Sequence, residues 1–326
     1  MTSGGAEAQG PQDNERHVMT SAPTPPMERV FKPDNMAALG WIAASVVTAS
    51  AMTIAVRQMT LELDSRMVVL ARFALTSAML VIAIALVPRL RQAVRFSEPG
   101  LHLRRGLSMA ISTHLGFFAI AHIDLVTVTV LFFTAPIFAI VLSVVLNGER
   151  TGPRRIVAMI VGFVGVLIIL RPGSQPLQWG MLAALSSSLF FAAALVQSRR
   201  IADIDGAFST LLSTVAITTL FSIPLAVPVW QIPAAPLTLI AISVTVLAGT
   251  LRMICDIQAY RLGEASFVGP FTYLRVVLIG VAAYFIFDEI PDYWAITGAV
   301  IIVAATIYIA RREALQKLPA AENARS

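Results

Sequence analysis

Ten apolar runs, separated by short polar segments, fill most of this 326-residue chain. They cover roughly 36–56, 66–87, 106–122, 125–146, 153–170, 178–198, 206–228, 236–260, 266–287 and 292–310. A helix needs about 17–25 apolar residues to cross the ~30 Å hydrocarbon core of a bilayer. The runs also lack the alternating pattern of barrel strands. The pattern therefore predicts an all-α integral membrane protein with ten transmembrane helices.

An internal repeat divides the ten runs into five and five. When the sequence is shifted by 140 residues, identical residues align in pairs: Gly40 with Gly180, Pro88 with Pro228 and Glu149 with Glu289. Because five is an odd number of spans, the second copy enters the membrane in the opposite direction. We therefore expect two inverted five-helix repeats, as in many secondary transporters. The expected domains are a tail at 1–34, repeats at 35–171 and 172–312, and a tail at 313–326.

Composition agrees with a membrane protein. The chain is 57% hydrophobic and only 13% charged, with a mean hydropathy of +0.77, whereas a soluble chain carries about 25% charged residues. The polar stretch 1–34 has no continuous apolar core, so we expect a disordered cytoplasmic tail rather than a signal peptide. The single cysteine, Cys255, excludes an intramolecular disulfide and a multi-cysteine metal site. No cofactor is expected.

The basic residues predict the orientation. When a charge at the very start of a span is counted with the adjoining loop, 18 of the 24 Lys and Arg residues fall in the tails and loops on one side of the predicted spans, three fall on the other side, and three lie within spans. Positive residues concentrate in cytoplasmic loops, so both termini are expected in the cytoplasm and the protein in the cell inner membrane. The net charge of +5 lies in short loops between apolar runs and does not indicate nucleic-acid binding.

Four charged residues lie well inside the predicted spans, away from their starts: Arg72, Arg252, Arg275 and Asp256. Charges at such depth are costly and mark functional sites by default. Arg252 and Asp256 are one helical turn apart, so they can pair on one face. Three positive charges against one negative charge favour a substrate with a carboxylate or phosphate group. The alternatives are an Arg72 side chain that extends to the interface and a purely structural Arg252–Asp256 pair.

Other side chains within the runs have two interpretations each. His114 could relay protons or pack as a neutral helix residue. Trp41 and Tyr273 could stack on a planar substrate or belong to helix packing. Pro136 and Pro270 each interrupt a predicted span, where proline removes a backbone hydrogen bond and can kink or hinge a helix. We group both prolines with Asp256, Glu149 and Glu289 as candidate gating or structural residues.

Motifs for several enzyme classes are missing from the sequence. The chain contains no GxxxxGK[ST], HExxH or GxSxG pattern. The first run contains no acid, which disfavours proton-driven export of lipophilic cations. An integral-membrane enzyme that modifies lipids remains an alternative, and the acids Asp288, Glu289 and Asp292 would be its nearest candidates. A structural or regulatory membrane protein is a third class.

Two long segments resemble the drug/metabolite transporter superfamily, EamA type. They are Ala121–Asp124 continued by LVTVTVLFFTAPIFAIVLSVVLNGER, and AYRLGEASFVGPFTYLRVVLIGVAAYFIFDEIPDYWAITGAVIIVAA. In that family a helix with a central proline and then a Glu precede the last helix of each repeat, which Pro136, Glu149 and Glu289 fit. Val276 stands where the second repeat should have its proline, which is found instead at Pro270. The resemblance covers about 36–311.

The resemblance implies a ten-helix carrier that alternates access to a central cavity. Arg72 resembles an arginine of the family's second helix, where it would lie outside the cavity. GPFTYLR followed by DEIPD resembles a bacterial branch that includes carriers of S-adenosylmethionine-like and riboflavin-like metabolites, and Tyr273 and Arg275 match that pattern. We expect a secondary transporter of a small organic metabolite with an anionic or zwitterionic group, or alternatively an exporter of amino acids or drugs. A proton or counter-solute, membrane lipid and a monomer or homodimer complete the expected partners.

Overall fold

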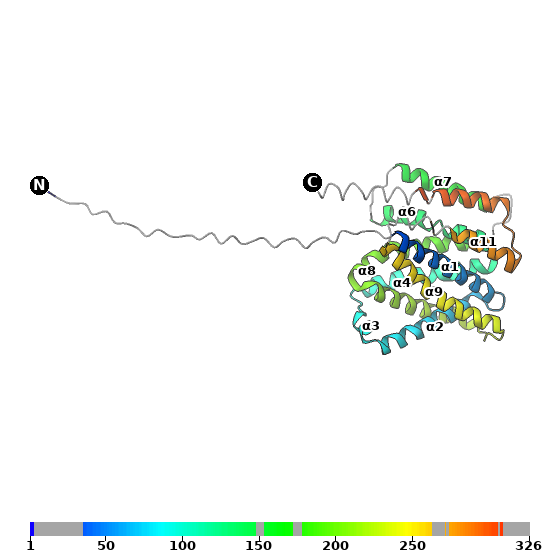
Figure 1. Ribbon diagram of the computed structural model, residues 1–326, viewed down its shortest axis with the longest axis horizontal. Coiled ribbons are helices and arrows are strands. Elements are labelled where there is room, and N and C mark those ends of the chain that lie inside the picture. Colours follow the sequence, from blue (N-terminus) through cyan, green and yellow to red (C-terminus); the bar gives the residue numbers. More distant parts are fainter. Residues whose placement is uncertain are drawn as a thin grey trace. The chain divides into compact units, whose positions relative to one another are not determined.

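The structure is a computed structural model that describes residues 1–2, 35–147, 153–171, 178–262, 271, 274–305 and 307–308. The regular elements in these ranges are helices (Figure 1). They are α1 Asn35–Met59, α2 Ser65–Leu86, α3 Pro88–Ala93, α4 Pro99–His122, α5 Leu125–Phe132, α6 Ala135–Asn147, α7 Pro153–Leu170, α8 Trp179–Ala226, η1 Val227–Val229, α9 Pro236–Leu262, α11 Leu274–Phe287 and an apolar helix over Tyr293–Ala305. Glu149, Pro270, Tyr273 and most of both expected tails lie outside the described residues.

The helices follow the predicted runs and confirm an all-α fold within the described ranges. Six helical segments there have both the length and the hydropathy to cross a membrane, and three shorter apolar helices accompany them. The largest difference is that α4 begins at Pro99, not near residue 106, because proline is well suited to the first turn of a helix. The short helix α3 was not predicted from the sequence.

Two interruptions of the helices have clear local causes. The run 125–146 is divided at Phe133 and Thr134, just before Pro136, since proline removes an N–H and clashes with the preceding turn. The runs 178–198 and 206–228 join into α8, which bends at Gly206 with φ 83° and ψ 161°. Glycine adopts this left-handed backbone without a steric penalty, so the bend separates two membrane-length segments.

Contacts between helices repeat across the two copies. α1 packs antiparallel along α9, with the Thr245 hydroxyl donating to Met59 Sδ at 3.6 Å near one end. α4 packs in the same way along the first half of α8, where the Ser112 hydroxyl donates to the Ser187 carbonyl at 2.8 Å (Figure 1). A shift of 140 residues converts α1 into the first half of α8 and α4 into α9. The contact of α1 with α9 is therefore repeated by the first half of α8 with α4, and each contact joins a helix of one copy to a helix of the other.

The contact between α7 and Tyr293–Ala305 has the same symmetry. A Cβ added to Gly165 would lie 2.8 Å from Ile302, and one added to Gly162 would lie 3.6 Å from the Cβ of Ala305. Shifting each number by 140 converts the first pair into the second. Such an exchange is expected for two copies related by a two-fold axis. Small residues at this contact let the helix backbones approach closely, as helix association in lipid requires.

Gly298→Ala is expected to destabilise the protein by about 1–3 kcal/mol. The new Cβ would lie 2.7 Å from the carbonyl oxygen of Gly165, and a backbone atom cannot rotate away. Gly40→Ala is the matched control because nothing lies within 4 Å of its Cβ position, and alanine favours a helix by up to about 1 kcal/mol. Thermal unfolding in detergent compares the two variants. Equal melting temperatures would contradict the close approach.

Candidate functional site

Four helices bring the predicted intramembrane charges to one region. Arg252 and Asp256 on α9 form the ion pair that their spacing predicts, with Arg252 Nε 3.5 Å from Asp256 Oδ2. Both side chains are 34% exposed. Asp256 also accepts a short hydrogen bond from the Ser45 hydroxyl on α1. One acid is thus shared between an arginine of its own helix and a hydroxyl of the facing helix.

Arg275 on α11 is held by α1. Its Nη2 donates to the Thr53 hydroxyl at 2.7 Å. Its Nε is buried and has no hydrogen-bond partner among the described residues. A buried donor without an acceptor is costly, and an anionic ligand beside the guanidinium would remove that cost. One donor of the Arg275 fork is therefore unused by the described protein groups.

Arg72 on α2 lies against α9 and α4. Its guanidinium carbon is 5.1 Å from the ring centre of Phe73 and 5.6 Å from that of Phe117, within the range of cation–π attraction. A Cβ added to Gly249 would lie only 2.8 Å from Arg72 Nη2. The Arg72 side chain has no hydrogen-bond acceptor and no ion-pair partner within the part of the chain that the structure describes.

Arg72, Arg252, Arg275 and Asp256 together form what we call the arginine cluster. The charge of Arg252 repels both Arg72 and Arg275, and Asp256 attracts Arg275. Three arginines against one acid leave two positive charges in the cluster. A charge-assisted hydrogen bond from a guanidinium to a carboxylate or phosphate is about twice as strong as a neutral one. The cluster is therefore suited to an anionic group.

The remaining predicted residues are not held in the arginine cluster by any described contact. His114 Nε2 lies 2.8 Å from the Ser222 hydroxyl and so links α4 to α8. Trp41 is 37% exposed and lies one helical turn before Ser45 on α1. Pro136 lies in the first turn of α6. Tyr273 cannot be placed because it lies outside the described residues.

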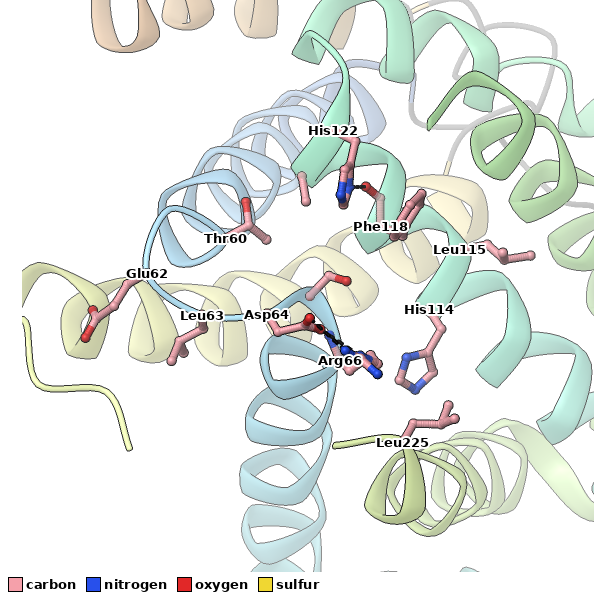
Figure 2. A pocket seen from close by; sticks show the side chains of 12 residues that line it. Thr60, Glu62, Leu63, Asp64, Arg66, His114, Leu115, Phe118, His122 and Leu225 are labelled. Carbon is pink, nitrogen blue, oxygen red and sulfur yellow. Dashed lines mark hydrogen bonds and ion pairs between the residues drawn. The ribbon is translucent and has the colours of Figure 1, made fainter. Parts of the chain in front are cut away.

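A cavity of about 770 Å³ lies at one end of α1, α2 and α4 (Figure 2). Its walls include residues of the loop before α2, the first residues of α2 and several α4 side chains, among them His114, while the four residues of the arginine cluster do not line it. Asp64 accepts hydrogen bonds at 2.9 Å from the backbone and side chain of Arg66. Chiefly through the side-chain bond, Arg66 lowers the pKa of the Asp64 carboxyl below its usual value. The lining of this cavity thus contains an ion pair.

A second polar network joins the two copies at the same end, which we call the Glu289 end. Arg57 Nη2 donates to Glu289 Oε1 at 2.8 Å, and Arg57 Nη1 donates to the Ile120 carbonyl at 2.6 Å. The backbone N–H of Leu125, in the first turn of α5, donates to Glu289 Oε2 at 2.7 Å. The carboxylate therefore also satisfies a helix N-terminus, where negative charge is favoured.

Sequence reasoning missed Ser45, Thr53 and Gly249, which contact the arginine cluster. It also missed Arg57 in the network at the Glu289 end. Ser45 and Thr53 are hydroxyls eight residues apart in an apolar helix, and that spacing places them near one face. It was the only signal for them. Gly249 is one of 19 glycines, and nothing in the sequence distinguishes it as the neighbour of an arginine.

Known proteins resemble this chain over most of its length. The S-adenosylmethionine uptake transporter of Rickettsia bellii is 29% identical over 83% of this chain and 92% of that protein. The riboflavin transporter of Vibrio cholerae is 27% identical over 69% and 76%. The pseudopaline exporter of Pseudomonas aeruginosa is 31% identical over 68% and 80%.

Comparison of folds and of family patterns agrees with these similarities. One known crystal structure superimposes with a TM-score of 0.55 at 17% identity, covering 85% of this chain and 98% of the other, which shows a shared fold. The EamA-like transporter family matches residues 36–171 and again residues 178–311. Both halves of the chain therefore belong to the EamA-like transporter family.

Proposed function

We propose that this protein is a secondary transporter that moves a small organic metabolite with an anionic or zwitterionic group across the inner membrane by alternating access. Membership of the family makes the chain a small-metabolite transporter, not an enzyme. The proposal adds the chemical class of the substrate, the membrane and the mechanism. No covalent chemistry is required, since the substrate binds, crosses and is released unchanged.

The arginine cluster carries the proposal for the substrate class. Arg275 has a buried Nε without a partner among the described residues, and the cluster has only one acid. Arginine presents a planar fork of donors that matches a carboxylate or phosphate. Burial of such a charge within a membrane span is expensive, so a charge found there is by default a functional candidate. A substrate anion would offset this cost while it is bound.

The relatives do not select one substrate. Their names specify S-adenosylmethionine, riboflavin and pseudopaline, which are chemically different compounds, and identities of 27–31% do not separate them. For that reason the proposed class follows from the residues of this chain. It includes organic acids and amino-acid-like compounds.

Alternating access is supported by the exchanged contacts of the two copies. In the proposed orientation both termini are cytoplasmic, so the Glu289 end faces outward. The Arg57–Glu289 network then ties helices of both copies together at the outer end. Opening toward the outside would require this network to separate. Tails at 1–34 and 313–326, and repeats at 35–171 and 172–312, belong to the same proposal.

A thermal-shift screen of the purified protein in detergent tests the substrate class. A ligand at 100 times its Kd stabilises the folded state by about 2.7 kcal/mol. Amino acids, organic acids, nucleoside derivatives and flavins make up the panel, and each hit is followed by flux into proteoliposomes. Acidic and zwitterionic compounds should give the largest shifts. Hits restricted to neutral or cationic compounds would refute the proposed class.

Export is a second candidate, favoured by the 31% identity to pseudopaline exporters. Uptake and export use the same fold, so only flux separates them. Proteoliposomes of known protein orientation, loaded on one side with the identified substrate, give the direction. Accessible tags at the two termini test the orientation, since tags on opposite membrane faces would contradict inverted repeats.

A further inference from the structure

Arg72 differs from the other partly buried arginines. Arg57 donates to Glu289 and to the Ile120 carbonyl, and Arg105 donates to Ser198 at 2.7 Å. Arg275 has the Thr53 hydroxyl. The guanidinium of Arg72 contacts two aromatic rings and, among the described residues, no acceptor. Its donors are thus not used by the described protein groups around it.

Gly249 provides the space that Arg72 occupies. A Cβ at that position would come within 2.8 Å of Arg72 Nη2 and 3.4 Å of Met52 Sδ. Any side chain larger than glycine would therefore push the guanidinium away from α9. Phe117, from α4, contacts the same guanidinium. The neighbours of Arg72 thus fix its position without neutralising its charge.

The single acid of the cluster is already engaged elsewhere. Asp256 pairs with Arg252 and accepts from Ser45, whereas Arg252 repels Arg72 as well as Arg275. Two guanidinium groups, on α2 and on α11, consequently lack a carboxylate partner among the described residues. An anion at Arg275 alone would leave Arg72 uncompensated.

We infer that Arg72 is a second anion-binding position and that the transported substrate carries two acidic groups. One group binds at Arg275 beside Thr53, and the other binds at Arg72 beside Gly249. This inference rests on the proposed function and narrows its substrate class. Carboxylates and phosphates share the required chemistry, and the substrate panel below distinguishes them.

The first test needs no ligand. In detergent, Arg72→Met should change the melting temperature of the empty protein little, because it removes a charge that Arg252 repels and that has no acceptor among the described residues. The variant loses only the cation–π contacts with Phe73 and Phe117. Arg57→Met is the matched control and should lower the melting temperature, since Arg57 has a carboxylate and a carbonyl acceptor. A fall in the Arg72 variant as large as that of the control would show a structural role and overturn the inference.

The second test measures flux in proteoliposomes with matched pairs of compounds. The pairs are glutamate and glutamine, aspartate and asparagine, succinate and succinamate, and phosphoserine and serine. The wild-type protein should favour at least one two-acid member by about tenfold or more, because its partner leaves one arginine unpaired. Preference for phosphoserine alone would identify a phosphate at one position.

Two variants then locate the second group. Arg72→Met should reduce the ratio of two-acid flux to one-acid flux to near one. Gly249→Ala should have the same effect although it keeps the charge of Arg72. Equal losses for both members of a pair would overturn the inference, as would a wild-type protein that favours no two-acid compound. If single-acid compounds are then still transported and their transport depends on Arg275, the proposed function stands without the second anion-binding position. Transport of neutral compounds alone would refute both the second position and the proposed function.

Discussion

Arg275→Gln is expected to lower transport of the acidic substrate by about 10- to 100-fold. A hydrogen bond to a charged group contributes about 1.5–3 kcal/mol, and each 1.4 kcal/mol corresponds to a factor of ten. The variant should act mainly through a higher KM, because the guanidinium binds the substrate and takes part in no chemical step. Initial rates of uptake into proteoliposomes over a range of substrate concentrations measure both effects.

Two further variants separate charge from geometry at this position. Arg275→Lys keeps the positive charge but loses the fork of donors, so its loss should be intermediate. Arg91→Gln on the exposed helix α3 is the control for removal of an arginine, and its flux should equal that of the wild type. If Arg275→Gln transports as well as Arg91→Gln, Arg275 has no place in the binding site.

The spans could be predicted because each depends only on local sequence. Hydrophobic length determines where a helix can cross lipid, and Pro136 and Gly206 account for the interruptions of the fourth run and of α8. The start of α4 was placed too late because its first two turns contain His102 and Arg104, which lower the hydropathy of that stretch. Buried packing of Leu101 and His102 allows the helix to begin at Pro99.

Partners across helices could not be predicted in the same way. Ser45 and Asp256 are separated by 211 residues, and one sequence indicates which helix a residue is on more reliably than which helix it faces. The Arg252–Asp256 pair could be predicted from the sequence because both residues lie within one helix. Family resemblance placed Arg72 on a helix outside the cavity, whereas the contact with Gly249 depends on how closely α2 and α9 approach.

The internal repeat identified Glu289 but not its partner. Arg57 corresponds, after the shift of 140, to Gln197, so the repeat retains the acid and not the base. Gln197 instead donates to the Ala193 carbonyl of its own helix at 2.9 Å. At the position equivalent to Arg57 the other copy has the neutral residue Gln197, which cannot form the same ion pair. The Glu289 end therefore has an Arg–Glu ion pair that the repeat does not reproduce through Gln197.

Glu289→Gln is expected to destabilise the protein by about 2–3 kcal/mol. The Arg57 and Glu289 side chains are 18% and 13% exposed, and removal of one partner of a buried pair leaves the other charge without compensation. The amide also presents one acceptor oxygen where the carboxylate used two, for Arg57 and for the Leu125 N–H. Thermal unfolding in detergent measures the loss.

A double-mutant cycle tests whether the loss belongs to the ion pair. If it does, Arg57→Met combined with Glu289→Gln should cost less than the sum of the two single changes, since neither charge then remains buried alone. Asp292→Asn is the matched control: its pair with Arg171 is 46% exposed on the acid side, and asparagine still caps the Ala295 N–H. An exposed pair contributes at most about 1 kcal/mol, so this variant should remain close to the wild type. Additive losses at Arg57 and Glu289 would mean that the network holds the two copies together only weakly, and opening at this end would then need another restraint.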